Sequence, residues 1–159
     1  MFHRKLTQLS LIAFTALFLS QASLAAGTSE DEENASTDWK TEVLQDLEDK
    51  YYQNAFKRLL EAETDNADTS ADWHNLMGYT MRMLDMPDLE ASEHHYIKAV
   101  ELKADHKGAL EYYGELKLQQ DDLEGAKKLL SRLEEVCPDG CEELDTLKKS
   151  VEAYEAKQK

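Results

Sequence analysis

Residues 107–138 constrain the fold of this chain more than any other stretch. Apolar side chains recur there at helical spacing in two runs, which meet at the polar segment 119–122. The apolar positions are Leu110, Tyr113, Leu116, Leu129, Leu130 and Leu133. Gly114 in the first run and Ala126 in the second are small, so two helices can cross closely there. The stretch therefore predicts two antiparallel helices whose tightest contact lies at Gly114 and Ala126.

The ends of the second predicted helix are marked by acidic residues and a proline. Asp121 can accept hydrogen bonds from the first free N–H groups, and Glu124 three residues later completes a capping box. Pro138 has no N–H group and ends the helix. A helix–turn–helix unit with small residues at these positions resembles one tetratricopeptide repeat (TPR), which has a period of about 34 residues.

A single repeat cannot bury its apolar face, so the resemblance implies further copies. One copy lies upstream, where Trp73 and Gly78 stand near family positions. Gly78 precedes Gly114 by about two residues more than one period. The turn at residues 84–88 accommodates the extra residues, because the entropy of loop closure depends only weakly on length. The second helix of this copy would carry Ser92, Tyr96, Ala99 and Leu102.

A third, weaker copy is predicted nearer the N-terminus. Ala55, Leu59 and Ala62 have the spacing of small and apolar residues that is expected in the second helix of a repeat. Residues 39–49 would form the first helix. Val43 stands where the family has glycine, so the alternative is one long helix over both segments.

An apolar stripe after Pro138 predicts a closing helix. The stripe consists of Leu144, Leu147, Val151 and Tyr154. TPR arrays commonly end in such a helix, because the last repeat would otherwise leave an apolar face open. The chain thus resembles an all-α solenoid of about two to three TPR helix–turn–helix repeats with a C-terminal capping helix, over residues 39–159.

The N-terminal region carries the features of an export signal. In residues 1–25, Arg4 and Lys5 precede a short apolar run, and the small residues Ser23 and Ala25 suit cleavage. The run is shorter than the ~20 residues of a membrane helix, so we expect cleavage, no membrane span afterwards, and a secreted or periplasmic protein. Residues 26–38 are acidic and contain few apolar side chains, which predicts a disordered segment.

The charge of the chain limits its partners. It contains 33 Asp plus Glu against 18 Lys plus Arg, for a formal net charge of −15. Such a surface repels nucleic acid and anionic lipid. Any charged partner is therefore expected to be basic.

The resemblance implies that a protein or peptide binds in the concave groove lined by the first helices of the repeats. The implied groove positions are Asn75, Tyr79, Arg82 and Met83 from one repeat and Glu111, Tyr112, Glu115 and Gln119 from the next. Some TPR domains clamp a C-terminal carboxylate with Lys, Asn and Arg. Here Glu111 and Glu115 stand where cations would be needed, so we do not expect that clamp.

No pattern of catalytic residues is found in the sequence. There is no Gly-rich phosphate loop, and no Ser–His–Asp or Cys–His constellation is suggested by spacing. The histidines after residue 25 are His74, His94, His95 and His106, and none of them form a His–x3–His pair. The expectation is a binding module or adaptor that is not an enzyme and has neither a cofactor nor a metal.

Cys137 and Cys141 are the only cysteines, and an exported chain would expose them to an oxidising compartment. Residues 138–140 between them form a turn sequence that can bring the two Cα atoms within disulfide range, so we predict a bond. A thiol-redox protein that uses the two cysteines is one alternative function, although redox motifs usually have two intervening residues rather than three. A structural subunit of an oligomer is another, and the sequence leaves the oligomeric state, the partner and the pathway open.

Overall fold

A computed structural model describes residues 35–63 and 67–158 of the chain. The predicted signal peptide, residues 1–25, lies outside the described residues, as does most of the predicted disordered segment 26–38. The first helix begins at Ala35, so the domain boundary predicted at residue 39 falls inside that helix.

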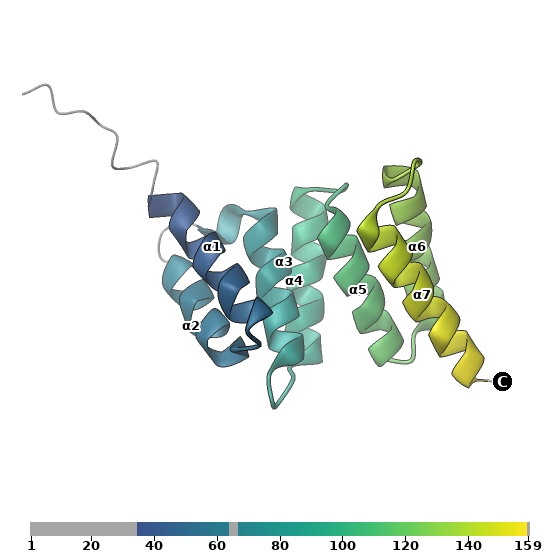
Figure 1. The fold of residues 1–159 in the computed structure, drawn as a ribbon, viewed down its shortest axis with the longest axis horizontal. Helices are drawn as coiled ribbons and strands as arrows, with labels where there is room; N and C mark the ends of the chain where they lie inside the picture. Colours follow the sequence, from purple (N-terminus) through teal and green to yellow (C-terminus); the bar gives the residue numbers. More distant parts are fainter. Residues whose placement is uncertain (1–34, 64–66, 159) are drawn as a thin grey trace, which may run out of the picture.

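The described part of the chain is helical and contains no strand (Figure 1). The helices are α1 (Ala35–Glu48), α2 (Tyr52–Glu63), α3 (Ala71–Met83), α4 (Leu89–Leu102), α5 (Lys107–Gln119), α6 (Leu123–Val136) and α7 (Glu142–Lys157), with a short 3-10 helix, η1, at Ala67–Thr69. The predicted all-α array is therefore confirmed. The alternative of one long helix near the N-terminus is wrong, because the chain turns between α1 and α2 through Lys50, whose φ is 62°.

The helices form three pairs and a closing helix. Each pair, α1 with α2, α3 with α4 and α5 with α6, is in contact along its length, and α7 packs on both α5 and α6. In addition, α1, α3, α5 and α7 contact one another in succession. These four helices therefore form one continuous inner face, with α2, α4 and α6 packed behind it (Figure 1).

Acidic caps start the second helix of two pairs, although one cap differs from the prediction. The carboxylate of Asp88 accepts from Ala91 N–H at 2.9 Å at the start of α4. At α6 the cap is Asp122, which accepts from Gly125 N–H at 2.8 Å, and not Asp121. Asp121 has a φ of 61°, in the left-handed region that reverses the chain after α5, so its carboxylate is directed elsewhere.

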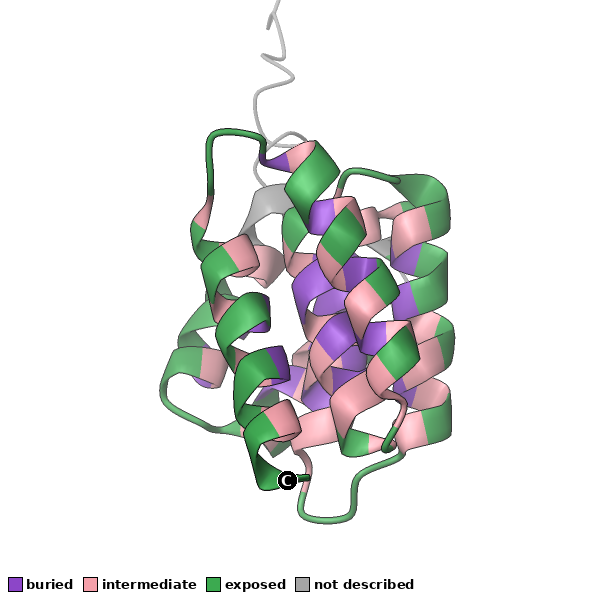
Figure 2. Cartoon of the chain, turned by 90° about the vertical axis from the view of Figure 1, so that its right-hand side faces the viewer, coloured by how far each residue is buried: buried purple, intermediate pink, exposed green. Residues whose placement is uncertain are grey.

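The core lies between the two helix layers (Figure 2). Trp73 is buried and donates from its indole nitrogen to the carbonyl of Leu59 at 2.9 Å, which fixes the first pair to the second. Within the second pair, the hydroxyl of Ser92 donates to the carbonyl of Gly78 at 2.6 Å. A Cβ on Gly78 would lie 3.0 Å from the ring of Tyr96, so the close approach of α3 and α4 depends on this glycine.

Gly114 makes its tightest contact with a different helix from the one predicted. A Cβ placed on Gly114 would lie 2.5 Å and 2.6 Å from the two methyl carbons of Leu147, and its three nearest atoms all belong to that side chain. Leu147 is fully buried on α7. The prediction of Ala126 as the closest partner was wrong because α7 occupies the place of a next repeat and inserts Leu147 against α5.

The corner between α6 and α7 contains the two cysteines. Cys137 and Cys141 lie at disulfide distance, with their Cα atoms 5.8 Å apart. Cys137 follows the last residue of α6, and Cys141 precedes the first residue of α7. Gly140, with a φ of 88°, supplies the left-handed turn between them.

Candidate functional site

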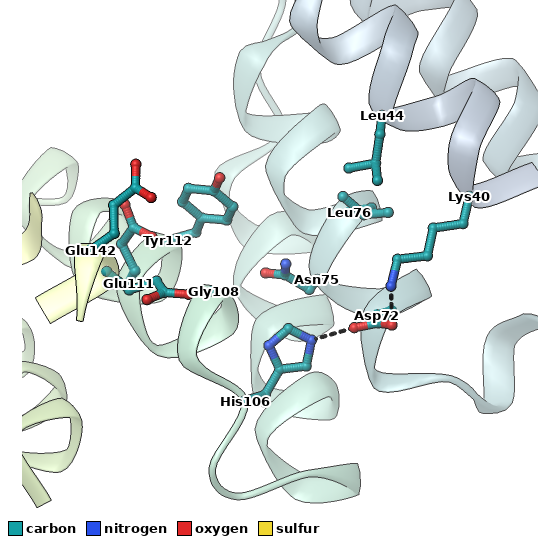
Figure 3. A pocket seen from close by; sticks show the side chains of 11 residues that line it. Lys40, Leu44, Asp72, Asn75, Leu76, His106, Gly108, Glu111, Tyr112 and Glu142 are labelled. Atoms are coloured by element: carbon teal, nitrogen blue, oxygen red, sulfur yellow. Dashed lines mark hydrogen bonds and ion pairs between the residues drawn. The ribbon is translucent and has the colours of Figure 1, made fainter. Parts of the chain in front are cut away.

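A groove of about 400 Å³ opens on the inner face of the array. On one side lies the α1 wall, made of Lys40, Leu44, Asp72 and Leu76. On the other lies the α7 wall, made of Glu111, Tyr112, Glu142 and Glu143. Asn75, His106 and Gly108 lie between the two walls (Figure 3). All four inner helices contribute to the groove, so it exists only when the array is assembled.

The charges of the α1 wall are compensated. Asp72 on α3 pairs with the ammonium of Lys40 on α1, and its other oxygen lies 2.9 Å from Nε2 of His106 (Figure 3). Nδ1 of His106 accepts from Ala109 N–H at 3.2 Å and caps α5, so Nε2 holds the proton and donates to Asp72. These contacts join three inner helices at one carboxylate.

The pKa of Asp72 reflects this pairing. Partial burial raises the pKa of the Asp72 carboxyl, but the hydrogen bonds from Lys40 and His106 outweigh it, so the pKa lies below its usual range. Asp72 is therefore ionised at neutral pH and already bound to two donors.

The carboxylates of the α7 wall have no such partners. Glu111 is only 9% exposed, although it faces the groove. Within residues 35–63 and 67–158, no ion pair joins Glu111, Glu142 or Glu143 to a basic side chain. Burial, together with repulsion from Glu115, Glu143 and Glu142, raises the pKa of Glu111 to about 7.

Asn75 adds an unused acceptor between the walls. The residue is 6% exposed, and its Oδ1 is buried with no hydrogen-bond partner among the described residues. Figure 3 shows this oxygen directed toward the side of the groove that carries Glu111 and Gly108. Because a buried carbonyl without a partner is unfavourable, a donor from a ligand would stabilise it.

The next part of the inner face contains four more of the predicted site residues. The ring centres of Tyr79 and Tyr112 are 4.7 Å apart with the ring planes tilted by 39°, and the guanidinium of Arg82 lies 5.6 Å from the centre of the Tyr79 ring. Arg82 also donates to Glu115 at 2.8 Å. Arg82, Glu115 and Gln119 line a second hollow of about 340 Å³ beside α7.

The structure thus divides the predicted site residues. Asn75, Glu111 and Tyr112 lie together in the main groove, whereas Arg82 and Glu115 neutralise each other farther along. Tyr79 supports Tyr112 from the side, and Met83 is partly buried and lines neither hollow.

The sequence-based prediction missed eight residues that line the groove. They are Lys40, Leu44, Asp72, Leu76, His106, Gly108, Glu142 and Glu143. Asp72 lies in the first turn of α3 and His106 is the N-cap of α5, so both lie at the N-terminal end of the first helix of their repeat. Glu142 and Glu143 gave no periodic signal, because they belong to the closing helix.

Two further properties bear on the site. None of the helices described here has the length and apolarity needed to cross a membrane. In the same part of the chain, no three His, Cys, Asp or Glu side chains are grouped closely enough to hold a metal ion.

No protein-family model and no curated protein matches this chain. Solved structures do match. SycD, the type III secretion translocator chaperone of Yersinia enterocolitica, aligns with a TM-score of 0.66 and 15% identity, over 81% of this chain and 89% of SycD. SycD in complex with a peptide of the translocator YopD aligns at 0.64 and 16% identity, over 79% and 95%.

A TPR domain is also similar. The first TPR of Spaghetti (RPAP3), bound to an HSP90 peptide, aligns with a TM-score of 0.61 and 19% identity, over 74% of this chain and 91% of that one. At these identities the likeness shows the fold, which is the TPR-like helical array predicted from the sequence.

Proposed function

We propose that this protein is a non-catalytic binding module that holds a segment of another protein in the groove between the α1 and α7 walls. The observation that carries the proposal is the groove itself, which four successive inner helices form and which contains the buried, unpartnered Oδ1 of Asn75. The peptide complexes of SycD and of the RPAP3 domain support it, because arrays of the same fold are seen there with bound peptides.

The groove offers both apolar and polar contacts to such a segment. Its volume of about 400 Å³ lies within the range of ligand sites. Leu44 remains 46% exposed at its edge, and Tyr112 presents an aromatic ring of the kind that dominates binding energies. These side chains can contact apolar residues of a peptide while Asn75 binds a backbone or side-chain N–H group.

The proposal includes a basic partner. Among the described residues that line the groove, four carry carboxylates, namely Asp72, Glu111, Glu142 and Glu143, and Lys40 is the one lysine. A negatively charged groove on a chain of net charge −15 favours encounter with a positively charged segment.

We also propose that the protein acts after export, in the periplasm or outside the cell. The signal-like residues 1–25 support this, as does the pairing of Cys137 with Cys141, since disulfides persist in oxidising compartments. Mass measurement of the protein from its own cells should give an N-terminus near residue 26, and an intact N-terminus would contradict export with cleavage. The thiol-redox alternative is less well supported, because Cys137 is only 4% exposed.

Site-specific photocrosslinking tests the binding function. A photoreactive residue replaces Tyr112 in the groove, and the matched control replaces Lys98, which is exposed on α4 behind the inner face. We expect a discrete crosslinked partner from position 112 and none from position 98. The substitution Leu44→Glu at the groove edge should reduce the yield from position 112. Equal crosslinking from both positions, or a yield that Leu44→Glu leaves unchanged, would contradict the groove.

A further inference from the structure

The two walls of the groove differ in a way that identifies what a bound segment must supply. We propose that the α7 wall is a receptor for one cationic side chain, a lysine or an arginine, projected by the bound peptide between Glu111 and the pair Glu142–Glu143. This inference rests on the proposed binding function and adds the chemistry that the site selects.

The first step of the argument is the position of the carboxylates. Glu111 belongs to α5, whereas Glu142 and Glu143 start α7, and the packing of these helices brings all three to one side of the groove. Glu111, Glu142 and Glu143 line the same groove, and repulsion from the two α7 glutamates adds to the effect of burial in raising the pKa of Glu111. A cation between them would remove this repulsion.

The second step is the unused acceptor. The amide oxygen of Asn75 is buried, has no partner among the described residues and points toward the same side of the groove (Figure 3). An ammonium or guanidinium group carries several N–H donors, so one group can bind a carboxylate and this amide together. A carboxylate or alkyl side chain at this position has no donor to offer Asn75.

The third step excludes other positions and other cations. At the α1 wall, Asp72 already binds Lys40 and His106, so a cation there would compete with existing pairs. Beyond Tyr112, Glu115 is held by Arg82. Among the described residues, no three acidic or histidine side chains are close enough to hold a metal ion, so the α7 wall suits a larger organic cation with several donors.

Binding of a cation should depend on pH through Glu111. The groups that act on it are Glu115 on its own helix, Glu142 and Glu143 from α7, and Arg82 from α3. With a pKa of about 7, Glu111 loses its charge as the pH falls from 8 to 6. Retention of a cationic peptide should therefore weaken over this range, and Glu111→Gln should remove most of that dependence.

Defined peptide pools test the inference. The probes are N-acetylated, C-amidated octapeptides with one central position fixed as Lys, Arg, norleucine or Glu and all other positions drawn from uncharged residues. They are passed over the immobilised full chain with its disulfide intact, and retained peptide is quantified by mass spectrometry. We expect the Lys and Arg pools to be retained about tenfold more than the norleucine pool, and the Glu pool least, at low salt.

The matched variants are two pairs of neighbouring glutamates. Glu142→Gln with Glu143→Gln changes the α7 wall, whereas Glu134→Gln with Glu135→Gln makes the same charge change at exposed positions of α6 outside the groove. Circular dichroism confirms that both variants are folded. The preference for Lys and Arg should fall to about twofold or less in the first variant and stay at the wild-type level in the second.

The outcomes separate this inference from the function on which it rests. Equal retention of the Lys, Arg and norleucine pools by the wild type would overturn the cation site while leaving a binding groove. An equal loss of preference in both double variants would also overturn it, because the effect would then come from net charge. If the wild type retained none of the pools, the cation site and the peptide-binding function would both be refuted.

Discussion

The α1 wall and the α7 wall place carboxylates a short distance apart in one groove but in opposite surroundings. Asp72 of the α1 wall is bound by Lys40 and His106, and its pKa is lowered. Glu111 of the α7 wall is buried beside further glutamates, and its pKa is raised to about 7. The α1 wall is therefore held together by its charges, whereas the charges of the α7 wall oppose its assembly.

This difference indicates what must hold the α7 wall in place. Repulsion among Glu111, Glu142 and Glu143 acts to move α7 away from α5. The opposing contacts are apolar and covalent, namely the insertion of Leu147 against Gly114 and the link between α6 and α7 through the two cysteines. The described residues of the α7 wall include no cation that could offset this repulsion, so the position of the wall depends on these contacts.

The largest expected effect comes from filling the contact at Gly114. Gly114→Leu should destabilise the fold by about 3 kcal/mol, because a Cβ there would overlap Leu147, and overpacking outweighs the roughly 1 kcal/mol gained by removing a helical glycine. Thermal unfolding measures the change, with Ser131→Leu at an exposed position of α6 as the control. A melting temperature at or above that of the wild type would mean that α5 and α7 are not closely packed.

The next effect should come from the cysteines. Replacing both Cys137 and Cys141 by Ser removes the constraint on a small loop and should cost about 2 kcal/mol. Amide exchange should accelerate first in α7, while α3 should change little because each helix contacts mainly its neighbours. Uniform acceleration over all helices would show that the link stabilises the whole array rather than the α7 wall.

A smaller effect, of opposite sign, is expected for Glu111. Its pKa is about 7 in the folded protein and about 4.3 in an unfolded chain, so the folded state retains a proton that the unfolded state has lost, and stability falls as the pH rises between these values. Glu111→Gln should therefore be more stable than the wild type at pH 8 by about 1–2 kcal/mol, after allowance for solvent screening in an open groove.

Denaturant titration at pH 5 and pH 8 tests this sign. Between pH 5 and pH 8, the free energy of unfolding of Glu111→Gln should fall by less than that of the wild type. A wild type that is equally or more stable than the variant at pH 8 would show that burial and the neighbouring carboxylates do not raise the pKa of Glu111.

The smallest effect is expected at the α1 wall. Asp72→Asn should lower stability by about 0.5–1 kcal/mol at pH 7, because partly exposed ion pairs contribute little. Since the pKa of Asp72 is lowered by folding, its contribution is present above about pH 4 and disappears as the pH falls through the folded-state pKa. If Asp72→Asn were still less stable than the wild type at pH 2, the loss of stability would come from a packing defect and not from the lost ion pairs.

The repeated part of the fold could be predicted from the sequence. The spacing of Gly78, Ser92 and Tyr96 placed the two helices α3 and α4 correctly, because local spacing determines which face of a helix is apolar. The same reasoning placed Asn75, Glu111 and Tyr112 in the groove through the repeat register.

The contacts outside the repeat pattern could not be predicted from the sequence in this way. The closing helix has no equivalent in the repeat pattern, so neither the insertion of Leu147 at Gly114 nor the presence of Glu142 in the groove followed from periodicity. The pairing of Arg82 with Glu115 depends on how two helices lie across each other, and side-chain spacing within one helix does not give that angle. Tertiary geometry decided these features.

The position of Glu142 and Glu143 on α7 has a consequence for biosynthesis. Chains emerge from the ribosome in N-to-C order, so α1 to α6 can pair before α7 is available. A chain at that stage contains the α1 wall, whose Asp72 is already occupied, but lacks Glu142 and Glu143 of the α7 wall. The proposed receptor for basic segments is therefore complete only after the last helix has been made and has packed against α5 and α6.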